Sequence, residues 1–166
     1  MSTQQQTEEK NIKIVQRSFE ALNTGDTSKV SEFIHPDYFN HESQASPERA
    51  KLRGPDEFTD TVKKLRAAFS DLHYEEQENI ASNDKVVSIV IVTGKHTGDF
   101  FGIPPKGNSF TYQAAHISRI VDDKIVEHKA IRDDLRFMMQ LGVIGAASRE
   151  YEPIINVWKG LMNKRT

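Results

Sequence analysis

Four polar side chains stand at even spacings around the Asp122-Asp123 dipeptide: Tyr112, His116, Lys129 and Asp133. If the dipeptide is the two-residue loop of a hairpin, His116 opposes Lys129 and Tyr112 opposes Asp133. Opposed residues share one face of a sheet, so this pairing places all four side chains on the same face. An Asp in an apolar setting can act as a general acid or base, because burial raises the pKa of a carboxyl group.

The remainder of this face is mostly apolar, with Phe110, Ala114, Ile120, Ile125 and Ile131. Charged groups on an apolar face must pair, stay hydrated or line a cavity, since isolated burial of a charge is costly. A cavity with apolar walls and a few polar groups is the usual form of a small-molecule site. We therefore expect the hairpin to form one wall of such a site.

Asp133 also has simpler structural interpretations. It could pair with Lys129 or Tyr112, or cap a short helix that follows it. The assignment of faces depends on a tight turn, because a one-residue slip in the register turns every side chain to the other face. His41, next to Asn40, could reach the pocket or lie on the surface, and His96 could order the loop that follows it.

The elements that position these residues change type halfway along the chain. Apolar residues at three- and four-residue spacing predict helices in the first half, and runs rich in Val and Ile predict strands in the second. We expect helices at 8–24, 27–34, 54–69 and 133–141, and strands at 72–80, 85–93, 109–121 and 124–132. Helices followed by antiparallel strands indicate an α+β fold.

Composition restricts the classes of function. The 166 residues carry a net charge of −2 and no cysteine, which argues against nucleic-acid or membrane partners and excludes disulfides and thiolate sites. The sequence offers no recognised metal-ligand spacing, nucleotide-binding glycine loop or Gly-x-Ser-x-Gly elbow. We expect one cytoplasmic domain over 1–166, with residues 1–7 frayed and 143–166 forming an extension with an amphipathic helix, and no metal or cofactor.

With these residues in view, the chain resembles the SnoaL-like polyketide cyclase (ester cyclase) family. The resemblance extends over about residues 11–142 and rests on three stretches: HPDYFNH at 35–41 with GPDEF at 54–58, GKHTGDFFGIPPKG at 94–107, and ISRIVDDKIVEH at 117–128 followed by Asp133 and QLG at 140–142. It implies a nuclear-transport-factor-2-like conical fold, in which a curved antiparallel sheet wraps around the N-terminal helices and encloses a pocket.

The resemblance also implies a reaction. Family members close a ring by intramolecular aldol condensation without metal or organic cofactor, and their acid/base Asp falls on Asp133. In that mechanism Asp133 takes a proton from an activated carbon, while His116 or Tyr112 hydrogen-bonds the developing enolate. We expect the substrate, a small hydrophobic or carbonyl-containing compound, to contact residues of the matching stretches and of the hairpin: Tyr112, Lys129, His41, Asn40 and Phe101.

The chain departs from the family pattern at Lys129, where the family usually has Trp. A cation there would weaken Asp133 as a base, or would stabilise an enolate or an acidic ligand. Two alternatives to an enzyme therefore stay open: a non-catalytic small-molecule-binding module, and a protein–protein interaction module. We also expect a homodimer or higher homo-oligomer, formed through the open sheet face and the tail around Trp158.

Overall fold

The computed structural model of the protein describes residues 2–45, 47 and 49–144. The first helix, α1, spans Thr3–Thr24 and begins with a capping box in which Ser2 and Gln5 satisfy each other's backbone N–H groups. Residues 3–7, expected to be frayed, are therefore helical. The helix ends at Gly25, as expected, in the left-handed conformation with φ +80°. The amphipathic stretch expected near Trp158 lies outside the described residues.

A short helix, α2 (Val30–Phe33), leads directly into strand β1 (Ile34–Asn40). Two 3₁₀ turns follow at His41–Ala45 and Arg49–Lys51, before helix α3 (Gly54–Ala68). Gly54 has φ +65°, and a Cβ there would come within 2.4 Å of the Pro36 carbonyl oxygen. This close approach requires glycine, and it fixes the start of α3 against β1.

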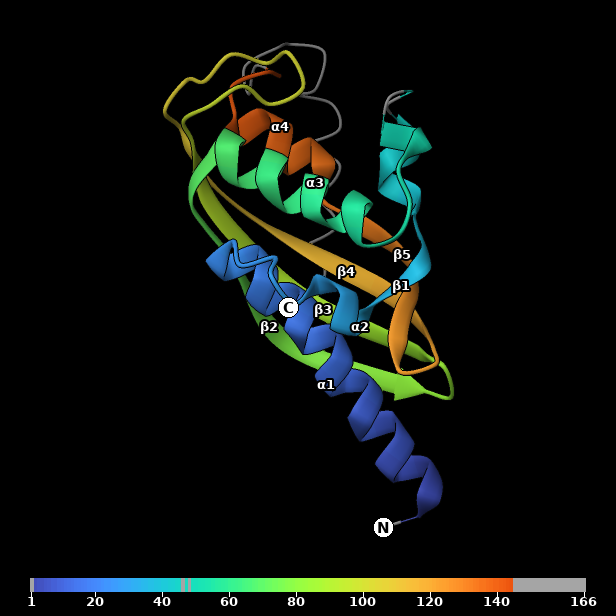
Figure 1. The fold of residues 1–166 in the computed structure, drawn as a ribbon. Coiled ribbons are helices and arrows are strands. Elements are labelled where there is room, and N and C mark those ends of the chain that lie inside the picture. Colours follow the sequence, from blue (N-terminus) through green and yellow to red (C-terminus); the bar gives the residue numbers. More distant parts are fainter. Residues whose placement is uncertain (1, 46, 48, 145–166) are drawn as a thin grey trace, which may run out of the picture.

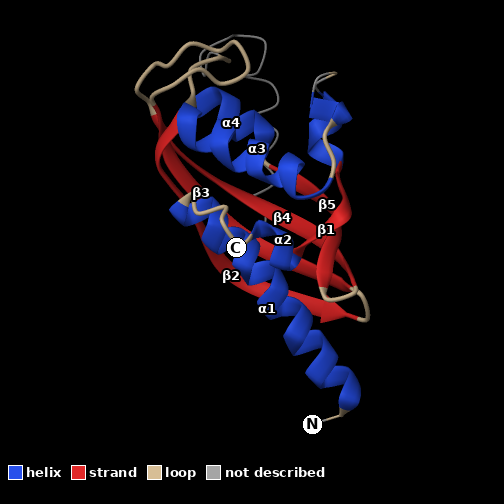
Figure 2. Cartoon of the chain, in the orientation of Figure 1, coloured by secondary structure: helices blue, strands red, loops and turns tan. Residues whose placement is uncertain are grey.

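The second half of the chain forms long strands and one short helix: β2 (Phe69–Ser82), β3 (Lys85–His96), β4 (Ser109–Val121), β5 (Lys124–Arg132) and α4 (Asp134–Gln140). The strand order is β1-β5-β4-β3-β2, with β1 parallel to β5 and the other neighbours antiparallel. The expected α+β class is confirmed, and Figure 2 shows the sheet curving behind the helices. The parallel β1–β5 pair was not expected.

The β4–β5 turn is the predicted two-residue loop. Asp122 and Asp123 have φ values of +49° and +60°, as a type I′ turn requires, and Ile120 opposes Ile125. At the next residue pair away from the turn the register shifts. Arg119 opposes Glu127, so Val126 is an extra, bulged residue on β5.

This bulge makes the expected pairing wrong beyond Ile125. His116 opposes Ala130 rather than Lys129, and Lys129 opposes Ile117. Opposed residues share a face, so Lys129 lies on the opposite face from His116. His128 takes the inward position instead, opposite Ser118.

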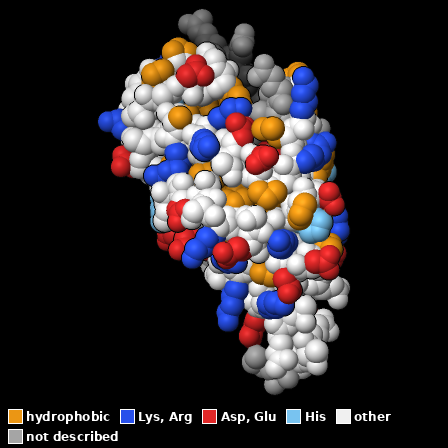
Figure 3. All heavy atoms as spheres, in the orientation of Figure 1, with side chains coloured by type: hydrophobic (Ala, Val, Ile, Leu, Met, Phe, Trp, Pro, Cys, Tyr) orange, Lys and Arg blue, Asp and Glu red, His pale blue; other side chains and the backbone are white. Residues whose placement is uncertain are grey.

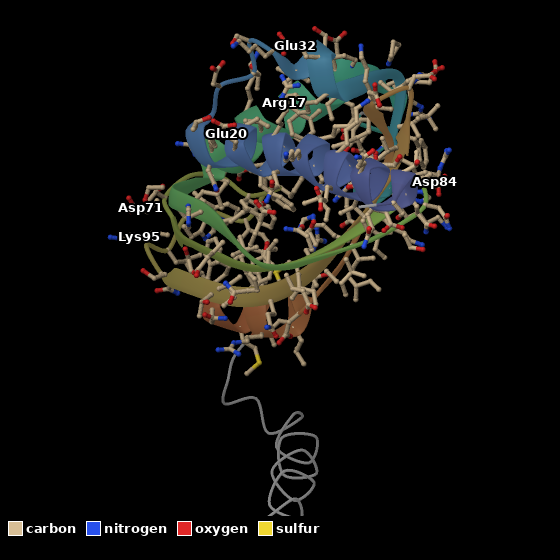
Figure 4. The ribbon with its side chains drawn as sticks, turned by 90° about the horizontal axis from the view of Figure 1, so that it is seen from below. Arg17, Glu20, Glu32, Asp71, Asp84 and Lys95 are labelled. Atoms are coloured by element: carbon tan, nitrogen blue, oxygen red, sulfur yellow. The ribbon has the colours of Figure 1, made fainter. Side chains whose placement is uncertain are left out.

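The core lies between the helices and the concave face of the sheet, where α1 and α3 lie across the strands (Figure 1). Strand β3 supplies the fully buried Val86, Val90 and Val92 to this layer. Figure 4 shows that side chains fill the space between α1 and the sheet, whereas Glu20 lies on the outer side of α1 and Arg17 of α1 pairs with Glu32 of α2. On the face drawn in Figure 3, Lys and Arg side chains are interspersed with Asp and Glu.

Candidate functional site

A cavity of about 710 Å³ lies between the helices and the concave face of the sheet. This volume falls within the usual range of small-molecule sites. Most of the lining is aromatic or aliphatic, and the aromatic residues come from α1, β1, α3, β2, the loop before β4, β4 itself and α4: Phe19, Tyr38, Phe58, Phe69, Tyr74, Phe100, Phe101, Phe110, Tyr112 and Phe137. The structure therefore has a cavity of the size that a small-molecule site requires.

One wall of the cavity is a cluster of phenylalanines centred on Phe137 of α4. The ring of Phe137 lies with its centroid 4.9 Å from that of Phe110 and 5.8 Å from that of Phe69, both edge-to-face, and 5.7 Å from that of Phe100. Edge-to-face packing is the geometry that aromatic quadrupoles favour. We refer to these four residues as the aromatic wall.

A second wall is polar and consists of Asn40, His116 and His128, which all line the cavity. His116 Nδ1 lies 2.9 Å from His128 Nε2, and His128 Nδ1 lies 3.1 Å from Asn40 Oδ1. The bulge in β5 makes this possible, because it turns His128 inward beside Asn40, which neighbours it in the parallel β1–β5 register. We refer to these three residues as the polar wall.

Behind the polar wall, α3 contributes a buried acid. Glu57 is 1 % exposed, and its Oε1 accepts a hydrogen bond from Asn40 Nδ2 at 3.1 Å. The same oxygen accepts from Ser43 Oγ and, at 3.1 Å, from Thr61 Oγ1. A continuous hydrogen-bonded chain therefore runs from Glu57 through Asn40 and His128 to His116.

His116 is the end of this chain. Its Nε2 is buried and has no hydrogen-bond partner among the described residues. The ring is held by edge-to-face contacts with Phe19 at 5.4 Å and Tyr74 at 5.9 Å between centroids. Because buried polar atoms are normally satisfied, an unpartnered nitrogen in a cavity wall is a candidate contact for a ligand.

The environment keeps both histidines of the polar wall neutral near pH 7. Burial lowers the pKa of His116 well below its ordinary value, and the neighbouring His128 and Arg132 lower it further. Burial likewise lowers the pKa of His128 to about 4, with Arg132 and His41 acting in the same direction. A neutral imidazole has one bare nitrogen, which can accept a proton.

A charged group lies beside the polar wall, at the C-terminal end of β5. Arg132 pairs with Glu42 at 2.7 Å and with Asp134 at 3.0 Å, and all three residues line the cavity. Burial opposes the charge on Arg132, but the two carboxylates outweigh it and raise its pKa. Burial also raises the pKa of Tyr112 to about 12, so its phenol stays protonated and can donate a hydrogen bond.

The cavity contains some of the residues expected from the sequence. It is lined by Tyr112, His116, Asn40 and Phe101, whereas His41, Lys129 and Asp133 are not among its lining residues.

The three residues outside the lining have other surroundings. His41 pairs with Glu127 at 2.8 Å, and Lys129 is exposed on the other face of the sheet. Asp133 is exposed and caps α4, accepting a hydrogen bond from the Arg136 backbone N–H at 3.1 Å. The capping role was one of the structural interpretations left open for it.

His96 is fully buried, with its ring centroid 5.6 Å from that of Phe69. The loop after it is held by backbone hydrogen bonds between residue 96 and residues 107 and 108. The side chain of His96 therefore contributes packing, and neither ring nitrogen has a hydrogen-bond partner among the described residues.

Sequence reasoning missed the residues that the bulge and β1 bring together: His128, Arg132, Glu42 and Glu57. One signal could have indicated the shifted register. If side chains alternated strictly along β5, Glu127 and Lys129 would both face an apolar cavity, and burying their charges there would cost free energy. A single bulged residue before Glu127 turns both side chains outward. Within the described part of the chain, no cluster of three or more His, Asp or Glu residues suits a metal ion. No described helix is long and apolar enough to span a bilayer.

Solved structures confirm the class of fold. TsrD of Streptomyces laurentii superposes with a TM-score of 0.73 at 24 % identity, covering 81 % of this chain and 96 % of that one. IdmH of Streptomyces antibioticus superposes with a TM-score of 0.68 at 28 % identity, covering 80 % and 98 %. The protein therefore has the nuclear-transport-factor-2-like α+β fold, with a cavity between the helices and the curved sheet.

Comparison of sequences identifies the family within that class. The model of the SnoaL-like polyketide cyclases matches residues 13–141, so the chain belongs to this family. It is 39 % identical over 132 residues to the aklanonic acid methyl ester cyclase DnrD of Streptomyces peucetius, covering 79 % of this chain and 90 % of the relative. It is 37 % identical over 123 residues to the nogalonic acid methyl ester cyclase of Streptomyces nogalater, covering 74 % and 90 %.

Proposed function

We propose that the protein is a cyclase that closes a ring within a small carbonyl compound by an aldol-type addition, without a cofactor. The observation that carries the proposal is the buried Nε2 of His116, which has no hydrogen-bond partner among the described residues and ends the polar wall of a mostly apolar cavity. The names of the relatives support an ester of a polyketide acid as substrate. A cavity lined by aromatic rings suits a flat ligand of this kind.

The proposed reaction starts at the polar wall. His116 Nε2 takes a proton from a carbon next to a carbonyl group, and the electron pair of the C–H bond passes into an enolate. The enolate carbon attacks a second carbonyl carbon of the same molecule, forming one C–C bond and leaving an alkoxide. The protonated His116 returns its proton to the alkoxide, so the product is an isomer of the substrate.

Tyr112 and Arg132 stabilise negative charge in this scheme. The Tyr112 phenol, protonated because burial raises its pKa to about 12, donates to the enolate oxygen. Arg132 supplies a positive charge at the same end of the cavity. Since the pKa of His116 is lowered well below its ordinary value, the carbon must be acidic. A carbon flanked by two carbonyl groups meets this requirement.

Asp133 stays a predicted acid or base on the strength of the family resemblance. Its present position at the cap of α4 offers a clean test, because Asn caps a helix as well as Asp does. Asp133→Asn therefore removes a carboxylate while retaining the cap. A loss of turnover without a loss of stability assigns Asp133 a chemical role in addition to the cap.

The experiment that tests the proposal is incubation with aklanonic acid methyl ester, followed by liquid chromatography and mass spectrometry. We expect a product of unchanged mass and altered retention, and a fall in turnover of about 100-fold or more in His116→Gln. The matched control is His73→Gln, at an exposed histidine of β2, which should keep wild-type turnover. Wild-type turnover in His116→Gln together with a loss in Asp133→Asn moves the role of base from His116 to Asp133.

A second candidate function is binding without chemistry, and the extent of the aromatic wall favours it. Such a module returns its ligand unaltered. Calorimetric binding of aklanonic acid methyl ester, with the compound recovered at its original retention time, supports the binding module over the cyclase.

The homodimer or higher homo-oligomer expected from the sequence also enters the proposal. All described helices lie on one side of the sheet, and the outer side carries Ile131, which is 68 % exposed on β5. We propose that this face joins two copies. Light scattering should give at least twice the mass of the 166-residue chain, and Ile131→Glu should reduce it to that of the single chain.

A further inference from the structure

The hydrogen-bonded chain behind the polar wall has a direction, which follows from the two groups that fix Asn40. Its Nδ2 faces Glu57 Oε1 at 3.1 Å, and its Oδ1 faces the backbone N–H of Glu42 at 3.2 Å. A backbone N–H only donates, so the Asn40 atom beside it must be the oxygen. The opposite side then presents the NH₂ group to Glu57, and the orientation of the amide is set.

This orientation determines the proton positions on both imidazole rings. Asn40 Oδ1 only accepts, so His128 must donate from Nδ1 across the 3.1 Å contact. A neutral His128 then has a bare Nε2, which accepts from His116 Nδ1 at 2.9 Å. His116, protonated at Nδ1, is left with a bare Nε2, the atom without a partner among the described residues.

We propose that Glu57 and Asn40 are positioning residues, which hold His128 and His116 in the tautomers that leave His116 Nε2 free to accept a proton in the cavity. The inference deepens the proposed function and rests on it for the role of His116 as base. Glu57 acts through Asn40 and does not itself line the cavity. Its Oε1 also accepts from Ser43 and Thr61, which anchor the carboxyl group between α3 and the first 3₁₀ turn.

The tautomers of the two histidines affect catalysis, whereas a hydrogen-bond network that only stabilises the fold would not. A His116 protonated at Nε2 instead presents a donor to the substrate and cannot start the reaction, although it fills the same space. Loss of the Asn40 oxygen frees His128 to adopt either tautomer, and His116 with it. The effect falls on kcat, because it changes the fraction of enzyme in the competent protonation state and leaves the shape of the cavity intact.

The first test is ring ¹⁵N NMR of the full chain labelled at histidine, at pH 7 and without substrate. Bare and protonated ring nitrogens have well-separated ¹⁵N shifts, so each tautomer is read directly. We expect both His116 and His128 to show a protonated Nδ1 and a bare Nε2. A protonated Nε2 on His116 overturns the proposal.

The second test uses variants with a matched control. Asn40→Ala should mix the tautomers of His128 and lower kcat by about 10- to 100-fold with KM unchanged. Asn40→Asp keeps an oxygen beside His128 and, with one proton shared between the new carboxyl group and Glu57 Oε1, should restore the wild-type tautomers. Glu57→Gln should lower kcat in the same direction as Asn40→Ala, by a smaller factor. The control, Glu127→Gln, changes an acid that contacts His41 outside the cavity, and it should leave tautomers and kcat unchanged. Wild-type tautomers in Asn40→Ala overturn the proposal.

The two readouts separate this inference from the proposed function. The expected tautomers without ring closure by the wild-type protein support the inference and count against the cyclase. Ring closure by a protein whose His116 is protonated at Nε2 supports the cyclase and overturns the inference. The NMR spectrum also shows whether Asn40→Ala is folded, and Glu57→Gln, which should act in the same direction, supplies the comparison if it is not.

Discussion

The cavity has a polar wall on β1, β4 and β5 and an aromatic wall on β2, the loop before β4, β4 and α4. The two walls are held together by different kinds of contact. In the polar wall, each of Asn40, His116 and His128 makes directed hydrogen bonds at 2.9–3.1 Å. In the aromatic wall, the ring of Phe137 packs on three other rings by contact alone. Replacing a single atom in the polar wall changes which groups donate and accept hydrogen bonds there. The aromatic wall is instead sensitive to changes in the volume of its side chains.

The two kinds of contact predict different effects of substitutions on stability and on activity. Burial of a phenylalanine is worth a few kcal/mol, and edge-to-face pairs add about 0.5–1.5 kcal/mol each. A buried hydrogen bond contributes only about 0.5–1.5 kcal/mol net. We therefore expect substitutions in the aromatic wall to act mainly on the free energy of unfolding, and substitutions in the polar wall to act mainly on turnover.

The largest effect should come from Phe137→Ala. Phe137 is 5 % exposed at the centre of the aromatic wall, and its loss leaves a cavity next to three rings. The free energy of unfolding, measured by urea denaturation, should fall by about 3–5 kcal/mol. Phe101→Ala, at a lining residue that is 58 % exposed, should cost less than about 1 kcal/mol. Equal losses in the two variants contradict the role of Phe137 as the centre of the packing.

The second effect is the dependence of stability on pH, which comes from the polar wall. Burial lowers the pKa of His128 to about 4 in the folded protein, so between pH 4 and 6.5 the unfolded chain binds more protons. The free energy of unfolding should therefore fall as the pH drops below 6.5, by on the order of 3 kcal/mol from His128 by pH 4. Urea denaturation from pH 4 to 7.5 measures the slope. His128→Gln should make it shallower and His73→Gln should not, and identical slopes in all three proteins count against the assignment.

Tyr112→Phe sharpens the comparison, because Tyr112 contacts the aromatic wall and also carries a polar group that lines the cavity. Its ring lies 4.9 Å from that of Phe137, and its phenol is the proposed donor to the enolate. The variant keeps the ring and removes only the hydroxyl group. The kcat for ring closure should fall about 10-fold, or about 1.4 kcal/mol in activation free energy, with little change in stability. A rise in KM at constant kcat would instead make the phenol a binding group.

The smallest effect should come from Lys129→Gln, which tests the register of β5. Lys129 lies on the outer face, so the unfolding free energy should change by less than about 0.5 kcal/mol and turnover should stay at the wild-type value. Arg132→Gln, three residues further on, leaves Glu42 and Asp134 without their shared partner in the cavity and should lower turnover about 10-fold or more. A loss of turnover in Lys129→Gln would instead support the strictly alternating register, in which Lys129 faces the cavity.

Most of the fold was predictable from local features of the sequence. Gly25 ended α1 as expected, and Asp122 and Asp123 formed the turn that their position suggested. The family resemblance added the curvature of the sheet, which periodicity alone does not give. What local features could not supply was the position of β1, because its parallel pairing with β5 joins segments far apart in the chain.

The candidate site was only half predictable for a related reason. Strict alternation placed Tyr112 and His116 correctly on β4, but it placed Lys129 and Asp133 in positions that the bulge gives to His128 and Arg132. Across from the bulge, the Ile120 backbone N–H donates to the Asp84 carbonyl oxygen at 2.7 Å, in the turn between β2 and β3. The turn chemistry of Asp122-Asp123 carries no information about that neighbour.

The tight turn between β4 and β5 has a consequence for the order of events during folding. His116 and His128 are 12 residues apart, whereas His128 and Asn40 are 88 apart. A hairpin closes within about 1–10 μs, and contacts between distant segments form later because a long loop must be closed first. The two imidazoles should therefore meet early in refolding, and the amide that fixes their protons should arrive only when β1 docks beside β5.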